Sequence, residues 1–223
     1  MSQEIPLSSS EIATLWMTYQ QKTMTQRILE YFIAQAEDNG AKEIMQDTHR
    51  QVVNYIEDIK TILQNEGAAI PVGYTEKDVN VGVPKLYNKM FDIMFLRLLK
   101  EISMGLHTLH LTMSYRKDMI SLYKELTAFT QSGYDKCVDY LQEKNVLPRP
   151  PAVSIPKTAK FAEGTDYMNG IHLFSSKRAL NTVEVAHIYY ASPSSTAVLK
   201  EELIMRIAFR AKASVTGFAF TDT

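Results

Sequence analysis

The sequence predicts an all-α fold in which four antiparallel helices form one bundle. Three observations predict it. Apolar residues recur at the helical period over four long segments, glycine and proline separate these segments, and one connection is much longer than the others. Hydrophobic residues make up 45% of the 223 residues and charged residues 22%, a composition typical of a globular protein. Amphipathic helices of this length bury one another's apolar stripes, and a bundle is the simplest solution.

The first two predicted helices form a hairpin. We expect a helix over residues 10–38, because Ser8 and Glu11 have the spacing of a capping box at its start. The Asn-Gly pair that follows should end this helix. A second helical pattern covers residues 41–66. Because the connecting turn is very short, the two helices should be antiparallel neighbours.

The connection between the second and third helices predicts the topology of the bundle. Residues 67–83 contain proline and three glycines, with Thr75 and Asp78 placed to cap a short turn. A loop of this length can stretch to about 56 Å. A helix of about 26 residues is roughly 39 Å long. The loop can therefore cross the bundle from end to end, which is the ferritin-like arrangement of two hairpins with one long crossover.

The third and fourth helices form the second hairpin. Pro84 suits the first position of a third helix that runs to about residue 112, and the fourth helix should cover about 116–145. Each carries an apolar stripe that we expect to face the core. The stripe of the third helix is Phe91, Phe95, Leu98, Ile102, Leu106, Leu109 and Met113. That of the fourth is Met119, Leu122, Leu126, Phe129, Gly133, Cys137, Tyr140 and Leu141.

The chain changes character after residue 147, which predicts three regions. Residues 1–147 form the bundle, and residues 148–179 form a proline-containing linker or strap. Residues 180–189, LNTVEVAHIY, are similar to residues 7–16, LSSSEIATLW. We therefore expect residues 180–223 to begin a second, incomplete bundle, a truncated repeat whose apolar helix must pack on the first bundle, pair with another chain or stay mobile.

Composition excludes several classes of function. The formal net charge of −1 argues against nucleic acid as the main partner. No apolar run reaches the roughly 18 residues of a membrane span. The N-terminus lacks the features of a secretory signal, and the single cysteine, Cys137, fits a reducing compartment. We therefore expect a cytoplasmic protein.

The weak candidates for metal ligands are Glu30, His49 and His110. Di-iron or manganese bundles use about four carboxylates and two histidines that project into the core. Helical phase places Glu30 on a face that we expect to point inward, with Ile12, Trp16, Tyr19 and Ile33. His49 lies largely inward at the same height on the second helix. His110 is at the border of the inward face of the third helix.

The rest of a two-metal ligand set is missing from the sequence. No Glu-x-x-His motif occurs, and on the third helix Glu101 and His107 should point away from the core. The acids of the fourth helix also point away. They are Asp118, Glu125, Asp135 and Asp139. We therefore expect no catalytic residues, no cofactor and no di-iron or manganese centre. Glu30 and His49 should form a buried hydrogen-bonded pair. The alternative is one zinc ion completed by His110 or water.

Several short motifs carry a family resemblance. They are NEGAAIPVGYTEKDVN at residues 65–80, PKL at 84–86, RPPAVSIP at 149–156 and LNTVE at 180–184. In this order they resemble the ferritin-like domain-of-unknown-function family 3231 of spore-forming Firmicutes, which is related to spore coat protein F. The resemblance implies two bundles in tandem. This chain departs from that pattern by ending early, as a truncated gene would.

The function predicted from the sequence is a non-enzymatic structural or interaction protein of sporulation. The resemblance implies a place in the mother-cell cytoplasm and the spore coat. The alternative is a metal-binding ferritin-like oxidoreductase or metal-storage protein. The expected partners are proteins or a second copy of the chain, with a homodimer formed through residues 180–223.

Overall fold

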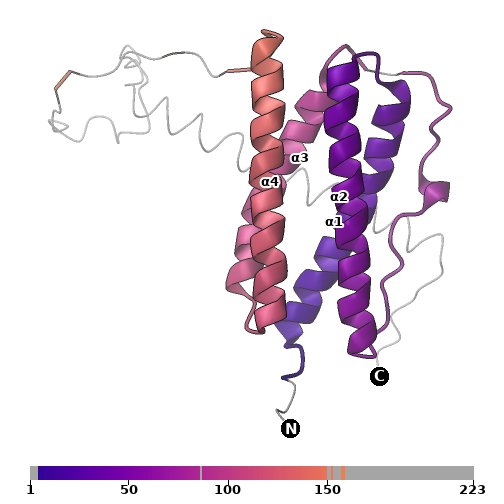
Figure 1. The fold of residues 1–223 in the computed structure, drawn as a ribbon, viewed down its shortest axis with the longest axis vertical. Helices are drawn as coiled ribbons and strands as arrows, with labels where there is room; N and C mark the ends of the chain where they lie inside the picture. Colours follow the sequence, from indigo (N-terminus) through magenta and orange to yellow (C-terminus); the bar gives the residue numbers. More distant parts are fainter. Residues whose placement is uncertain (1–4, 86, 150–151, 153–156, 159–223) are drawn as a thin grey trace, which may run out of the picture. The chain divides into compact units, whose positions relative to one another are not determined.

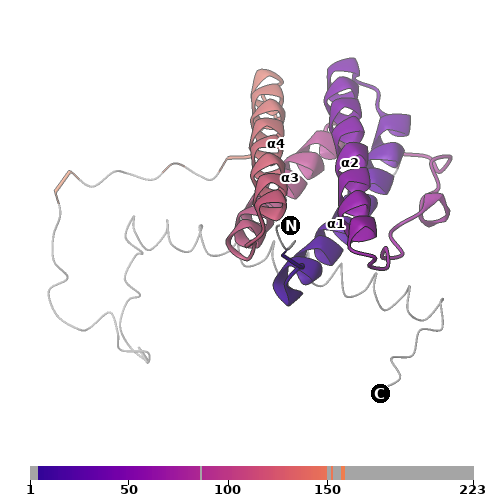
Figure 2. The ribbon, with the colours of Figure 1, turned by 60° about the horizontal axis from the view of Figure 1, so that its bottom comes forward.

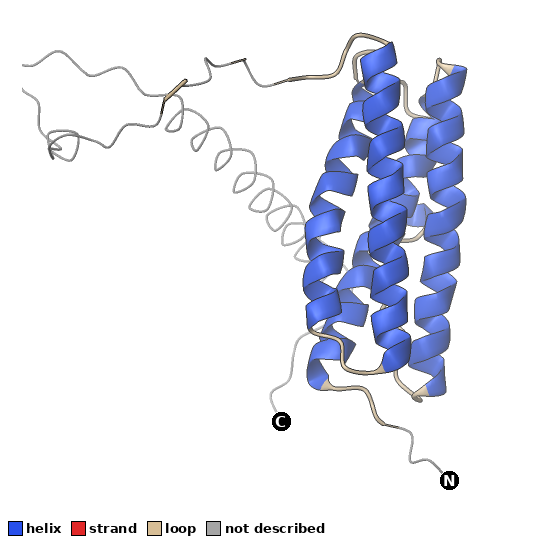
Figure 3. Ribbon diagram, turned by 60° about the vertical axis from the view of Figure 1, so that its left-hand side comes forward, coloured by secondary structure: helices blue, strands red, loops and turns tan. Residues whose placement is uncertain are grey.

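The computed structural model describes residues 5–85, 87–149, 152 and 157–158. Within them lie four α-helices and one short 3₁₀ turn, without strands (Figures 1 and 3). The helices are α1 (Ser9–Gln35), α2 (Asn39–Asn65), α3 (Phe91–Thr112) and α4 (Lys117–Glu143), and the turn is η1 (Glu76–Asp78). The predicted all-α class is confirmed. The predicted second repeat lies outside the described residues.

The four helices form two antiparallel hairpins joined by one crossover. In Figure 1, α1 rises and α2 descends, the crossover returns along the outside of the bundle, and α3 descends before α4 rises. α2 and α4 lie in front in this view, and α1 and α3 lie behind them. Figure 2 shows the crossover and η1 standing beside the α1–α2 hairpin. This is the predicted topology, with the single end-to-end crossover of ferritin-like bundles.

Capping side chains fix the ends of the helices, and Glu11 is the main one. The Ser8–Glu11 capping box is present, as predicted, and Glu11 is 1% exposed. Its Oε1 also accepts the backbone N–H groups of Tyr115 and Arg116, both at 2.8 Å, in the α3–α4 turn. Burial alone would raise the pKa of Glu11, but the N–H donors of Arg116, Ser8 and Tyr115 lower it to about 2. One carboxylate therefore caps α1 and holds the α3–α4 turn against it.

Two predicted helix boundaries are wrong. The Asn39-Gly40 pair begins α2 instead of ending α1, because the Asp38 carboxylate caps α2 by accepting the N–H of Ala41 at 3.0 Å. Pro84 does not start α3. Pro84 lies outside any helix, after the turn and bend of residues 81–83, and Tyr31 of α1 donates its hydroxyl to the Pro84 carbonyl at 3.1 Å. α3 begins only at Phe91.

The apolar core consists of two clusters, one toward each end of the bundle. The lower cluster is built around Leu15, Tyr19, Val52, Ile56, Ile59, Leu63, Met119, Leu122, Tyr123 and Leu126. The upper cluster contains Leu29, Phe32, Ala41, Met45, Met90, Ile93, Leu96, Cys137 and Leu141. The stripes of α2 and α4 supply much of both, as the sequence predicts. Cys137 is fully buried, which agrees with its expected role in packing.

The inward faces predicted for α1 and α3 are wrong in part, although Tyr19 of the predicted α1 face is buried in the core. Phe91 and Leu109 of the predicted α3 stripe are 44% and 54% exposed, and Ile12 and Trp16 of α1 are 41% and 43% exposed. Both helices keep apolar residues in the core, such as Leu15, Leu29 and Ile93, but many of their other inward residues are polar. They are Thr14, Thr18, Gln21 and Lys22 on α1 and Lys100, Ser103, His107 and His110 on α3. Six of these groups can be buried because they pair across the two helices: Thr18 with His110, Gln21 with Ser103 and Lys22 with His107.

Candidate functional site

The structure brings two of the three predicted ligands together. His49 Nε2 lies 3.4 Å from Glu30 Oε1, which joins α2 to α1 as the helical register indicates. The same Glu30 oxygen lies 2.9 Å from Arg27 Nη2. The Glu30 and His49 side chains are 26% and 25% exposed, so the pair is half-buried rather than buried. Glu30 therefore has a cation already bound to the oxygen that faces the imidazole.

His110 does not complete this pair. Its Nδ1 lies 3.2 Å from Thr18 Oγ1, and Thr18 precedes Glu30 by twelve residues on α1. Twelve residues of helix span about 18 Å. Across the part of the chain that the structure describes, no three His, Cys, Asp or Glu side chains are grouped so that they could share a metal ion. The donors present at Glu30 therefore do not fit the mononuclear zinc alternative.

A polar layer separates the two apolar clusters at mid-height of the bundle. It consists of Thr18, Gln21 and Lys22 of α1, Lys100, Ser103, His107 and His110 of α3, and Tyr123 and Thr130 of α4. Every one of these residues is less than 8% exposed. We refer to this set as the polar layer.

The centre of the polar layer is a chain of hydrogen bonds through His107. Lys22 Nζ lies 3.1 Å from His107 Nε2, and His107 Nδ1 lies 3.0 Å from Thr130 Oγ1. The Thr130 hydroxyl donates to the carbonyl of Leu126 at 2.8 Å. This order of donors places the imidazole proton on Nδ1 and leaves Nε2 to accept from Lys22. Both ring nitrogens are thereby used, and no lone pair remains for a metal ion.

Three further polar contacts join the helices. Thr18 Oγ1 lies 3.2 Å from both His110 Nδ1 and the Tyr123 hydroxyl, which joins α1, α3 and α4. Gln21 donates to Ser103 Oγ at 2.9 Å. The α1–α3 contact is thus held by hydrogen bonds where α2 and α4 contribute apolar packing.

Lys100 is the most unusual member of the polar layer. Its Nζ lies 3.6 Å from the centre of the Phe129 ring, which is close enough for a cation–π contact. Its chain passes over Gly133, where an added Cβ would lie 2.7 Å from Lys100 Cε. Burial lowers the pKa of Lys100 to about 8. The glycine on α4 therefore leaves the space that this buried amine occupies.

Both histidines of the polar layer are held neutral. Burial, followed by the charge of Lys22, lowers the pKa of His107 to about 2 and that of His110 to about 4. At neutral pH the layer therefore consists of neutral imidazoles, hydroxyls, an amide and positively charged lysine groups. This composition does not attract a metal cation, because carboxylates, which supply negative charge in such centres, are absent from it.

The apolar stripes alone do not predict the polar layer. A second signal was present. Residues 9–24 contain only Glu11 and Lys22 as charged residues, and residues 102–115 contain no Asp, Glu, Lys or Arg. A helix whose polar face is solvated normally carries charges there. A polar face of Thr, Ser, Gln and His without carboxylates indicates burial instead.

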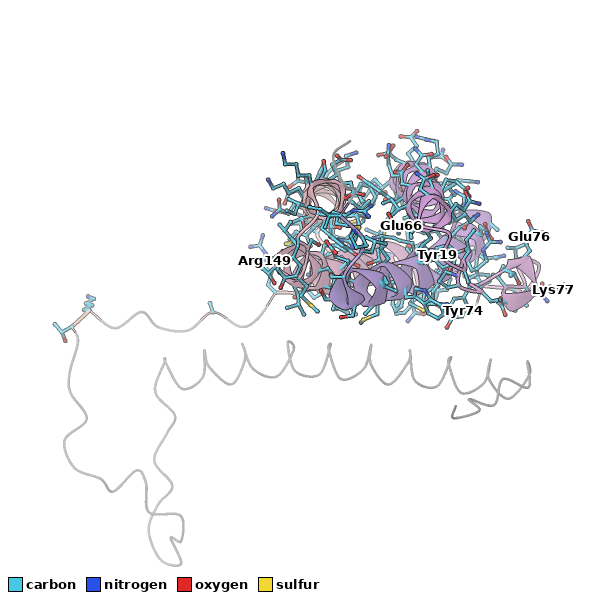
Figure 4. The ribbon with its side chains drawn as sticks, turned by 90° about the horizontal axis from the view of Figure 1, so that it is seen from below. Tyr19, Glu66, Tyr74, Glu76, Lys77 and Arg149 are labelled. Carbon is cyan, nitrogen blue, oxygen red and sulfur yellow. The ribbon has the colours of Figure 1, made fainter. Side chains whose placement is uncertain are left out.

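A hollow of about 580 Å³ lies between α1, α2 and the crossover. Figure 4 shows Tyr19 and Tyr74 near each other, with Glu76 and Lys77 on η1 at the outer edge. The crossover is fixed there because the N–H of Tyr74 donates to Thr23 Oγ1 at 3.0 Å. The charged groups of its floor are paired within the protein. Lys60 lies 2.7 Å from Glu57. Ion pairs within the protein, Lys60 with Glu57 and Arg27 with Glu30, therefore line this hollow.

The outer side of the α1–α3 layer carries an exposed apolar patch. We define the apolar patch as Ile12, Trp16 and Met17 of α1, Leu109 of α3 and Tyr115 of the α3–α4 turn, which are 41% to 74% exposed. Ser10 ties the two elements by donating its hydroxyl to the Met113 carbonyl at 3.1 Å. This bond joins the two elements that carry the patch.

Comparison with known proteins places the chain in a family. The family described as "Protein of unknown function (DUF3231)" matches residues 1–158. The chain belongs to this DUF3231 family. The resemblance inferred from the sequence motifs is confirmed. No curated protein matches this DUF3231 chain.

Solved structures of similar fold support the bundle assignment. A candidate spore coat protein of Bacillus halodurans is 15% identical, with a TM-score of 0.61 over 68% of this chain and 98% of that one. A DUF305 fragment from Deinococcus radiodurans is 11% identical, with a TM-score of 0.52 over 62% and 99% of the two chains. A conserved hypothetical protein of Mycobacterium tuberculosis is also 11% identical, with a TM-score of 0.50 over 66% and 98%. At these identities the likeness is one of fold.

No helix among the described residues of this DUF3231 protein is both long enough and apolar enough to span a membrane.

Proposed function

We propose that this DUF3231 protein is a non-enzymatic structural or interaction protein of sporulation, associated with the spore coat. The apolar patch is the observation that carries the proposal. It exposes aromatic and aliphatic side chains, including Trp16 and Tyr115, and these residue types dominate binding at protein interfaces. The fold shared with a candidate spore coat protein supports a place in the coat.

The core of the bundle fits a structural role. The donors and acceptors of the polar layer form hydrogen bonds between helices. At His107, both ring nitrogens have partners. Glu30 and His49 join α1 to α2 in the same way. A catalytic centre would need groups open to a substrate. These side chains act instead as fixed connections that hold the α1–α3 layer in place.

Localisation in sporulating cells tests the proposal. A fluorescent fusion of the full chain, expressed from its own locus, should collect at the surface of the developing spore. The substitution Trp16→Glu should leave the fusion spread through the mother cell, because a charge at the centre of the apolar patch opposes burial. Ser132→Glu on α4 is the matched control. It adds the same charge at an exposed site, four residues before Lys136.

Uniform fluorescence of the unchanged fusion throughout sporulation would reject the coat assignment. Equal localisation of the Trp16→Glu fusion would reject the patch as the interaction surface.

Elemental analysis of untagged protein, purified from cells grown with added iron, manganese and zinc, tests the non-enzymatic part of the proposal. We expect substoichiometric metal. Close to two iron or manganese ions per chain, lost on Glu30→Ala, would favour the oxidoreductase or storage alternative.

A further inference from the structure

We propose that the apolar patch is the interface of a homodimer, in which two copies of the chain pack α1 against α1 about a two-fold axis. The inference rests on the proposed function, since it names the partner of the same surface. The dimer would place the α1–α3 layers of two copies face to face. Their apolar patches would then form a second core outside the first.

The charge distribution favours a second copy as the partner. Over residues 9–24 the charged side chains are Glu11 and Lys22, which are 1% and 4% exposed. Residues 102–115 contain no Asp, Glu, Lys or Arg. A two-fold axis brings each surface group near its own copy, so a charged group near the axis would meet a like charge. Two copies of the face that carries the apolar patch can therefore pack together without such a repulsion.

The shape of α1 also fits pairing with itself. Small exposed residues, Ser9 and Ala13, alternate with the large exposed residues Ile12 and Trp16. In an antiparallel pair whose axis passes between residues 12 and 13, Trp16 faces the partner subunit's Ser9, and Ile12 faces the partner subunit's Ala13. Each large side chain then meets a small one, which is how ridges on one helix fill grooves on the other.

The size of the apolar patch is adequate for such a contact. Its five side chains, each about half exposed, present roughly 500 Å² if each contributes close to 100 Å². A stable interface buries about 800 Å² per partner, and its centre is apolar and poor in charge. The exposed uncharged residues beside the patch, such as Ala13, Thr108 and Thr112, supply the remaining area.

Sedimentation equilibrium of the full chain tests the dimer. We expect a dimer for the unchanged protein at micromolar concentration. Trp16→Glu should raise the dimer dissociation constant at least roughly a hundredfold, since buried interface tryptophans are typical hot spots. The circular dichroism spectrum should stay unchanged, because Trp16 is an exposed position in the single chain. Ser132→Glu should remain dimeric.

A cysteine cross-link tests the pairing of the two α1 helices. Ala13→Cys places a thiol beside the axis, so mild oxidation should give a covalent dimer at low protein concentration. Ser132→Cys should not, and the native Cys137 is buried. A monomer at every concentration, or a Trp16→Glu protein that stays dimeric, would overturn the inference. If the unchanged chain is monomeric while its localisation still depends on Trp16, the proposed function stands and the dimer does not.

Discussion

The buried histidines of the polar layer should make the stability of the bundle depend on pH. The pKa of His110 is lowered to about 4 and that of His107 to about 2, from an ordinary value of 6.5. The unfolded chain therefore binds protons at a higher pH than the folded chain does. Stability rises with pH wherever the unfolded state binds more protons. Acidification from pH 7 to pH 5 should therefore favour unfolding.

The size of this effect follows from the two pKa values. Each histidine contributes about 1.4 kcal/mol per pH unit below its unfolded pKa. Over the interval that ends at pH 5, this amounts to roughly 2 kcal/mol for each residue and about 4 kcal/mol for both. The pKa of the capping carboxylate of Glu11 is lowered to about 2 from 4.5, so most of its own contribution is lost below pH 5. The histidines are therefore the main destabilising groups in this interval, while Asp92 and Asp58, whose pKa values burial raises, act in the opposite direction.

Urea unfolding followed by circular dichroism at pH 7, 6 and 5 measures the effect. The free energy of unfolding should fall by about 4 kcal/mol in the unchanged protein. In His110→Asn, which keeps a polar atom toward Thr18, the fall should be near 2 kcal/mol. Thr108→Asn, at an exposed site on the same helix, should keep the full dependence. Equal stability at pH 7 and pH 5, or an unchanged dependence in His110→Asn, would refute the reasoning.

Three further perturbations test other parts of the structure. Glu11→Gln should lower the free energy of unfolding by roughly 2–3 kcal/mol, because it weakens four charge-assisted hydrogen bonds, and the urea midpoint reports it. Gly105→Ala should stabilise the protein by about 0.5–1 kcal/mol. Gly133→Ala should destabilise it by roughly 1 kcal/mol, because the new Cβ would lie 2.7 Å from Lys100 Cε, whereas a Cβ added at Gly105 meets no neighbouring atom. Equal melting temperatures of the two variants would contradict this. A chain that ends at residue 179 should stay dimeric if the apolar patch is the interface, whereas a monomer would support the predicted dimer through residues 180–223.

The sequence predicted the fold well because topology depends on features that are local in the chain. The Ser8–Glu11 capping box and the turn capped by Thr75 and Asp78 are both present. The crossover spans the bundle because its length allows it and the short hairpin turns leave no other path. The helix boundaries at Asn39 and Phe91 were harder to predict, since they depend on contacts with other parts of the chain, such as Tyr140 and Lys144 at the Asp38 cap.

The candidate site was predicted only in part. Glu30 and His49 were placed together because two antiparallel helices with a short turn fix their relative height. His107 was assigned to the outside, yet it is fully buried. Periodicity gives the angle of a residue around its helix but not which side of that helix faces the bundle. Where one face is apolar and the other is neutral and polar, either can be buried.

The polar layer and the apolar patch have one origin. α1 and α3 bury polar residues of the layer and expose apolar residues of the patch on their other side. A bundle that buried the apolar stripes of all four helices would expose Lys22, His107 and Lys100 to water, where each would be readily solvated. The observed fold buries them, keeps them satisfied through bonds such as that of Thr130 to His107, and exposes Trp16 instead. Burial of polar groups adds little net stability even when every bond is made. The exposed stripe supports pairing with a second copy, because burying it would add apolar contact on the outer side of α1 and α3 to the contact that Leu29 and Ile93 make inside the bundle.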